Sequence, residues 1–103
     1  MTIGQYILEG HTPVPCGDIR EWGQWMESNS RRVRQDYFDA IRISTVFLGL
    51  DHSFGMDGPP VLFETMVFVG PLHEEMDRYS TWDEAEAGHN RMMERVVGAM
   101  ING

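Results

Sequence analysis

The sequence predicts a single α+β domain, a mainly antiparallel sheet of four or five strands with two helices. The chain has 103 residues, a length that suits one hydrophobic core and would leave two separate domains too small to be stable. Its composition is 42% hydrophobic and 23% charged, which is typical of a chain that folds. The hydrophobic pattern changes from helical to strand-like and back to helical, which favours α+β layers over a βαβ repeat. We therefore expect residues 1–103 to form one domain.

The first predicted element is a short strand. Residues 5–8 form an apolar run that ends before Gly10. Pro13 and Pro15 then favour an extended path, because proline fixes φ and lacks a backbone donor.

The next element is a helix over about residues 19–29. Asp18 is a good N-cap, and Glu21 stands three positions later, as in a capping box. Apolar residues recur at helical spacing, and we expect Trp22 and Trp25 to lie against the sheet.

The middle of the chain has the strongest strand signals. Residues 32–37 and 41–50 read as a hairpin with a tight connection, and residues 61–69 form a further strand rich in β-branched and aromatic side chains. The connection at residues 51–60 is longer than most hairpin loops. Because long loops often carry binding residues, we interpret this one as a candidate functional segment.

A last strand near residues 75–79 is followed by a helix over about residues 82–100. Thr81 and Glu84 have the spacing of a capping box. Apolar side chains recur every three to four residues along the helix, which predicts that one stripe of it faces the sheet.

The two central strands predict a sheet with two apolar faces. If Leu50 pairs with Val61, alternation places Phe47 on one face and Phe63 on the other. Each face would then need a cover. We expect the two helices to cover opposite faces, or one face to bind another protein chain, as in a homodimer.

Glu64 is an isolated carboxylate among the apolar residues of its strand. An unpaired buried carboxylate is costly, so we expect Glu64 to pair with an arginine such as Arg42 or Arg34. The alternative is a functional acid with a raised pKa.

Charge and cysteine content restrict the class of function. The net charge is −8, and all eight basic residues are arginines, so we expect no direct nucleic-acid binding. The single cysteine, Cys16, allows no internal disulfide, which favours a cytoplasmic protein. Residues 1–10 lack the pattern of a secretory signal, and no segment approaches the roughly 20 apolar residues of a membrane span.

Four residues are candidate ligand-binding groups: Asp51 and His52 at the start of the long loop, together with Glu64 and His11. Their atom types suit a metal ion, but their spacing matches no metal motif. The sequence also lacks a nucleophile elbow and a phosphate-binding glycine loop. We therefore expect no catalytic residue, no metal site and no cofactor.

Acidic residues crowd around the last strand and the start of the last helix. Such a group is either a solvated surface or an array that binds a basic protein surface. The residues are Glu74, Glu75, Asp77, Asp83, Glu84 and Glu86.

Three runs of sequence carry a resemblance to a known family. They are residues 45–52 (TVFLGLDH), 58–68 (GPPVLFETMVF) and 78–89 (RYSTWDEAEAGH). With residues 11–15 and the helix of Trp22 and Trp25, they resemble a family of small uncharacterised proteins encoded by bacteriophages and prophages. The resemblance implies a location in the cytoplasm of an infected or lysogenic bacterial cell.

These observations leave three hypotheses of function. The first is a non-catalytic protein that binds and modulates a host or phage protein with a basic surface, for example as a host-defence antagonist. The second is a binder of a nucleotide or metabolite, held by Asp51, His52 and the 51–60 loop at a dimer interface. The third is a metal-dependent enzyme that uses His11, His52 and Glu64.

Overall fold

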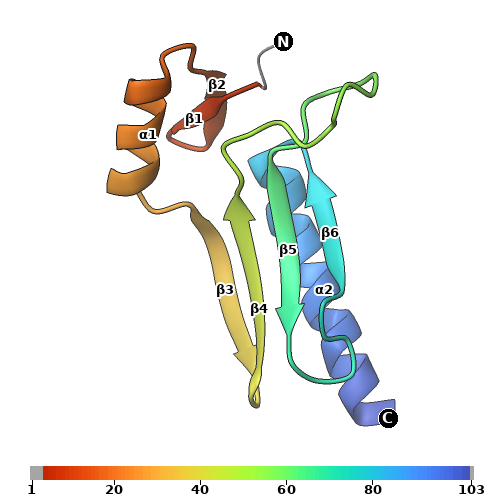
Figure 1. Ribbon diagram of the computed structural model, residues 1–103. Helices are drawn as coiled ribbons and strands as arrows, with labels where there is room; N and C mark the ends of the chain where they lie inside the picture. The colour runs from red at the N-terminus through yellow and green to blue at the C-terminus, as the bar shows by residue number, and fades with distance from the viewer. Residues whose placement is uncertain (1–3, 103) are drawn as a thin grey trace.

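The computed structural model describes residues 4–102 and confirms the α+β class, with two helices and two antiparallel sheets (Figure 1). The four-stranded sheet has its strands in chain order, and the remaining two strands form a separate hairpin. The elements are β1 (Tyr6–Glu9), β2 (Thr12–Pro15), α1 (Ile19–Ser28), β3 (Arg32–Phe38), β4 (Ile41–Phe47), β5 (Phe63–Phe68), β6 (Met76–Tyr79) and α2 (Trp82–Asn102).

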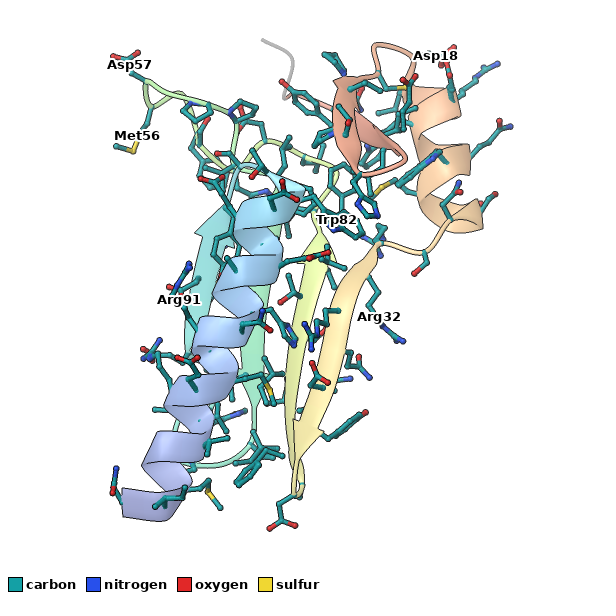
Figure 2. The ribbon with its side chains drawn as sticks, turned by 180° about the vertical axis from the view of Figure 1, so that it is seen from behind. Asp18, Arg32, Met56, Asp57, Trp82 and Arg91 are labelled. Carbon is teal, nitrogen blue, oxygen red and sulfur yellow. The ribbon has the colours of Figure 1, made fainter. Side chains whose placement is uncertain are left out.

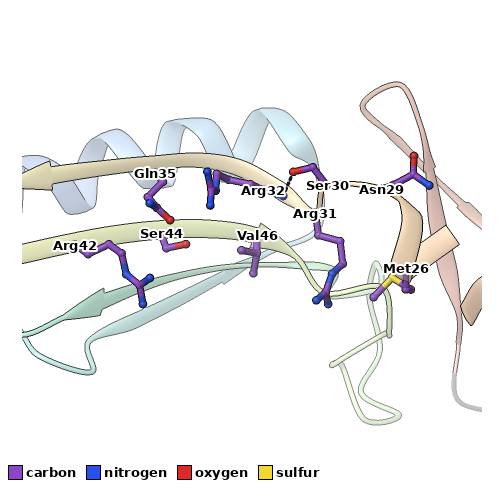
Figure 3. Close-up of a pocket in the computed structure, with 9 residues that line it drawn as sticks. All are labelled: Met26, Asn29, Ser30, Arg31, Arg32, Gln35, Arg42, Ser44 and Val46. Carbon is purple, nitrogen blue, oxygen red and sulfur yellow. Dashed lines mark hydrogen bonds between the residues drawn. The ribbon is translucent and has the colours of Figure 1, made fainter. Parts of the chain in front are cut away.

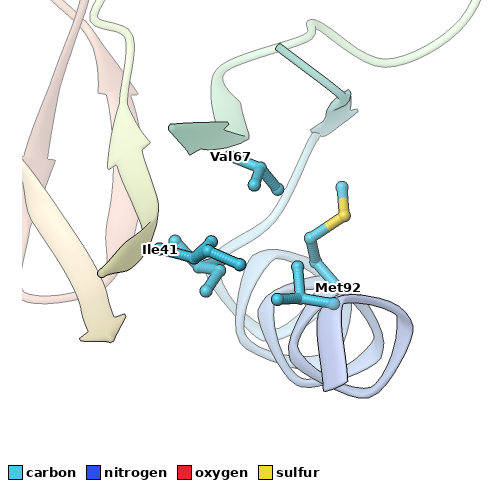
Figure 4. Packing of buried hydrophobic residues seen from close by; sticks show 5 residues of the cluster. Ile41, Val67 and Met92 are labelled. Atoms are coloured by element: carbon cyan, nitrogen blue, oxygen red, sulfur yellow. The ribbon is translucent and has the colours of Figure 1, made fainter. Parts of the chain in front are cut away.

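The four-stranded sheet and α2 form two layers. In Figure 1 α2 runs behind strands β5 and β6, and it contacts all four strands of the sheet. The molecule measures 48 × 31 × 20 Å, and its smallest dimension fits one sheet plus one helix, which has a diameter of about 10–12 Å. The layers enclose the core at two places. Figure 4 shows one cluster, around Ile41, Val67 and Met92, and a second cluster surrounds Phe47 and Phe63.

The register of β4 and β5 differs by one residue from the predicted one. Phe47 pairs with Phe63, so both rings point to the same face, and both are fully buried beneath α2. Because side chains alternate along a strand, a shift of one residue moves one strand's whole apolar set to the other face. The prediction that Phe47 and Phe63 lie on opposite faces is therefore wrong.

The opposite face of this sheet, which we call the open face, has a mixed character. No helix or strand within residues 4–102 packs over it, and it faces the viewer in Figure 1. Half-buried apolar side chains there stand beside arginines and neutral polar groups, so the prediction of a second wholly apolar face is wrong. The register assigns to the open face Arg32, Gln35, Tyr37, Arg42, Ser44, Val46, Glu64, Met66, Phe68, Met76 and Arg78.

Helix α1 does not cover the open face. It packs against β1 at one end of the molecule, and Trp25 makes an edge contact with Phe47, with ring centroids 5.8 Å apart. The alternative in which the two helices cover opposite faces is thus wrong.

Pro13 and Pro15 lie in β2, where they alternate with residues whose backbone amides can donate hydrogen bonds. Just after this strand, the Cys16 amide donates to the Gln5 carbonyl at 2.8 Å.

Gly49 joins the small hairpin and α1 to the main sheet. Its carbonyl accepts from the Tyr6 amide at 2.8 Å and from the Trp22 indole at 3.1 Å. Its φ is +77°, in the left-handed region that favours glycine, and a β carbon there would displace the end of the Met26 side chain. This turn ends β4 at Phe47 rather than at the predicted residue 50.

The predicted caps define where both helices begin. The Asp18 carboxylate accepts from the amides of Arg20 and Glu21 at the start of α1. Thr81 and Glu84 form a reciprocal capping box at the start of α2, with bonds of 3.1 and 3.0 Å. In the part of the chain that the structure describes, no helix is long and apolar enough to cross a membrane.

Close packing of α2 against β6 gives a testable prediction at Gly88. A β carbon on Gly88 would overlap the ring of Tyr79, which is 9% exposed, so Gly88→Ala should destabilise the protein by about 2 kcal/mol or more. Gly98, in the same helix, has open space around it, so Gly98→Ala should be neutral or stabilising by up to about 1 kcal/mol. Urea denaturation of both variants measures the difference, and equal stabilities would contradict the packing described.

Candidate functional site

A chain of hydrogen bonds crosses the core from β3 to β5 through α2. His89 Nε2 lies 2.8 Å from the Asp36 carboxylate, and His89 Nδ1 lies 2.7 Å from the Thr45 hydroxyl. The Thr45 hydroxyl is 2.5 Å from that of Thr65, its direct partner across the sheet. His89, Thr45 and Thr65 are all fully buried, whereas the Asp36 side chain at the end of the network is 34% exposed.

The Asp36 carboxylate determines which group donates in each hydrogen bond of the network. Because a carboxylate only accepts, His89 Nε2 donates to Asp36, and neutral Nδ1 accepts from the Thr45 hydroxyl, which in turn accepts from Thr65. The hydrogen bond from His89, supported by Arg34, holds the pKa of Asp36 below its usual value. Burial lowers the pKa of His89, although Asp36 opposes this shift. The neutral imidazole is therefore the form that the fold favours.

The order carboxylate, imidazole, hydroxyl is that of a catalytic triad, but the hydroxyl cannot meet a substrate. Nucleophilic catalysis requires an accessible oxygen, and Thr45 is fully buried between β4 and α2. Buried groups that are fully hydrogen-bonded instead make a unique core arrangement. The network acts structurally, and His89 binds a carboxylate and a hydroxyl.

Asp51 and His52 hold the long loop in place. Asp51 Oδ1 accepts from the amides of Ser53 and Val61 at 2.8 and 2.9 Å. Burial acts to raise the pKa of Asp51, but these amide bonds keep it below its usual value. His52 Nδ1 bonds to the Leu50 carbonyl at 2.8 Å. Asp51 Oδ1 and His52 Nδ1 thus close the base of the loop.

His11 and Glu64 occupy separate places. His11 stacks on Trp82, with parallel rings 3.8 Å apart, at the start of α2. Glu64 lies on the open face and pairs with Arg78, directly across the sheet, at 3.0 Å. The sequence predicted an arginine partner for Glu64, but the two candidates that it indicated, Arg42 and Arg34, are wrong. Within residues 4–102, no three histidine, cysteine or acidic residues are grouped so that they could hold a metal ion.

The acidic residues divide between two regions rather than forming one array. Glu75 and Asp77 contact Arg95, at 2.7 and 4.0 Å. Asp83 is twelve residues before Arg95 along α2, which corresponds to about 18 Å of helix. Near Asp83, Glu84 caps the helix and Glu86 accepts from the Trp82 indole at 2.6 Å.

The loop tip is the most exposed apolar feature. Phe54 and Met56 are 78% and 77% exposed, and Figure 2 places Met56 and Asp57 at the outer end of the loop, away from α2.

A group of arginines on the open face and at its border is the feature that sequence reasoning missed. Arg31, Arg32 and Arg42 line a hollow where β3 and β4 meet the end of α1 (Figure 3). In the described part of the chain, none of the three forms an ion pair, whereas Arg34, Arg78 and Arg95 each contact a carboxylate. The net negative charge of the chain gives no sign of a local basic group. The alternation of side chains along the strands of residues 32–46 could have indicated that arginines gather on one face of the sheet.

Comparisons with protein-family models, with curated proteins and with solved structures find no match to this chain. The resemblance to bacteriophage proteins therefore stays a prediction.

Removing the Thr45 hydroxyl should destabilise the protein. Thr45→Val keeps the shape of the side chain but leaves the buried His89 Nδ1 without its donor, at a cost of about 1–3 kcal/mol. Thr45→Ser is the matched control, because it keeps the hydroxyl and loses one methyl group, worth roughly 0.8 kcal/mol. Thermal and urea unfolding measure both, and a valine variant as stable as the wild type would contradict the structural role of the network.

The network should also make stability depend on pH. Unfolded histidine takes up a proton as the pH falls through about 6.5, whereas folded His89 resists protonation, so the free energy of unfolding should decrease below that pH. Asp36 adds to this loss at more acidic pH, because its lowered folded pKa stabilises the fold only while the carboxylate is charged. An NMR titration of the His89 ring should show protonation below pH 6.5, and protonation at or above that pH would contradict the prediction. His89→Gln should show a smaller loss of stability on acidification.

Proposed function

We propose that this chain is a non-catalytic binding protein that docks an acidic surface of a partner protein onto its open face. The observation that carries the proposal is the contrast between the two faces of the four-stranded sheet. One face is buried beneath α2, and the other presents apolar side chains and arginines without a covering layer within residues 4–102.

Charge favours an acidic partner. The open face has three arginines and a single carboxylate, and Arg31 lies at its border, whereas the chain as a whole carries −8. The separation of the positive open face from the negative remainder of the molecule would orient a partner. The open face attracts a negative surface, and the rest of the molecule repels it. The proposed partner surface is therefore acidic, whereas the sequence predicted a partner with a basic surface.

The open face also has side chains that suit a protein interface. Tyr37 is 62% exposed and Met76 is 41% exposed, at opposite edges of the face. Between them lies Phe68, with the Arg42 guanidinium 4.1 Å from its ring centroid. Tyrosine, methionine and arginine are enriched at interfaces. Tyrosine and arginine combine apolar area with hydrogen-bond donors, and the flexible methionine side chain adapts its apolar surface to a partner.

The two alternative hypotheses receive less support. At the 51–60 loop, Asp51 Oδ1 and His52 Nδ1 already bond to the backbone, which leaves a ligand only one polar atom on each side chain. A metal-dependent reaction would need His11, His52 and Glu64 to converge, and Glu64 is already paired with Arg78. The resemblance to bacteriophage proteins supplies the setting of the proposal, in which the partner is a host or phage protein.

Affinity capture with two matched variants tests this proposal. Met76→Glu places a charge on the open face, and Met100→Glu places the same charge on α2 at a site of similar exposure, 39% against 41%. We expect the wild type and Met100→Glu to retain the same acidic protein from a bacterial lysate, and Met76→Glu to lose at least nine-tenths of it. Binding should weaken as salt is raised.

Three results would overturn the proposal. The first is a retained protein that Met76→Glu binds as well as the wild type does. The second is a retained protein with a basic surface. The third is a light-scattering mass of two chains that Met76→Glu reduces to one, because the open face would then bind a second copy.

A further inference from the structure

The hollow beside the end of α1 has the composition of an anion site. It has a volume of about 440 Å³, within the range of small-molecule sites. Side chains that line it include Asn29, Arg31, Arg32, Gln35, Arg42 and Ser44, and none of the lining residues that the structure describes is acidic. Figure 3 shows Arg31 and Arg42 extending to the same side of β4, with Val46 between them.

No carboxylate balances the three arginines that line the hollow. The protein has twice as many acidic as basic residues, and Arg34, Arg78 and Arg95 have acidic partners, whereas the three lining arginines, like Arg20 and Arg91, form no ion pair within the described residues. The exposed or half-buried guanidinium groups repel one another only weakly through water, and negative charge placed among them would be attracted by all three. A bound anion would supply the negative charge that the lining of the hollow lacks.

The chemistry of the lining specifies the kind of anion. A guanidinium group only donates hydrogen bonds, and its planar fork fits two oxygens of a phosphate or a carboxylate. The Ser44 hydroxyl adds a neutral donor, and the Asn29 and Gln35 amides, which already donate to the Trp25 carbonyl and the Tyr37 hydroxyl, each keep one further N–H. The stacking of Arg42 on Phe68 holds one guanidinium in place before a ligand arrives, which lowers the entropy lost on binding.

We propose that this hollow binds a small multivalent oxyanion, with its phosphate or carboxylate groups among Arg31, Arg32 and Arg42. The inference goes beyond the proposed partner docking and does not depend on it, because it concerns a free ligand of the isolated protein. Since the hollow lies on the open face, a bound anion would compete with an acidic partner there.

Titration of the purified protein tests the inference without a partner. Isothermal calorimetry with pyrophosphate and with citrate, each against sodium chloride of equal ionic strength, separates phosphate from carboxylate recognition. We expect saturable one-to-one binding in one of the two arms. Arg31→Gln and Arg42→Gln should each weaken it by about tenfold or more, because each removes hydrogen bonds to a charged group.

Arg20→Gln is the matched control, because Arg20 is an exposed arginine on α1 outside the hollow. It should bind like the wild type. Arg31 lies outside the strands, so its variant tests the site even if Arg42→Gln folds poorly. The inference is overturned if neither anion binds saturably below 10 millimolar, on the order of the weakest useful affinity, or if the Arg31 and Arg42 variants bind as tightly as the Arg20 variant. Either result leaves the capture experiment with Met76→Glu to judge partner docking separately.

Discussion

The pairing of Phe47 with Phe63 across β4 and β5 is the constraint on which the rest of the structure depends. It places both rings, with Thr45 and Thr65, on the face that α2 covers. The bonded hydroxyls of these threonines lie between the two apolar clusters of the core. A slip of one residue would separate the hydroxyls and place Glu64 under the helix, where an ionised carboxylate is costly. The polar network and the apolar clusters therefore favour the same register.

That register also determines the shape and charge of the exposed surface. With α2 on one face, the molecule is only 20 Å thick, and the second face of the sheet meets solvent. Arg32 of β3 and Arg42 of β4 lie on this face, whereas Glu75 and Asp77 lie near Arg95 of α2. An acidic protein thus acquires a basic face, and this asymmetry is the basis for both the docking and the anion site that we propose.

Local signals predicted the elements well. The Asp18 cap and the box formed by Thr81 and Glu84 begin the helices where they were expected, because capping depends on neighbours in the chain. The functional interpretation of Asp51 and His52 was less secure. A polar pair in a long loop reads as a ligand site, but both side chains bind the loop backbone, and only the path of the loop reveals this.

The sequence alone determined the fold class, the positions of both helices and the presence of the two central strands, β4 and β5, because periodicity, capping and turn residues act over a few positions. Tertiary structure decided the register of β4 and β5, the position of α1 beside β1, and the partners of His89 and Glu64. These depend on contacts between residues far apart in the chain. Alternation gives each strand two candidate faces, and only packing against α2 selects the one that is buried.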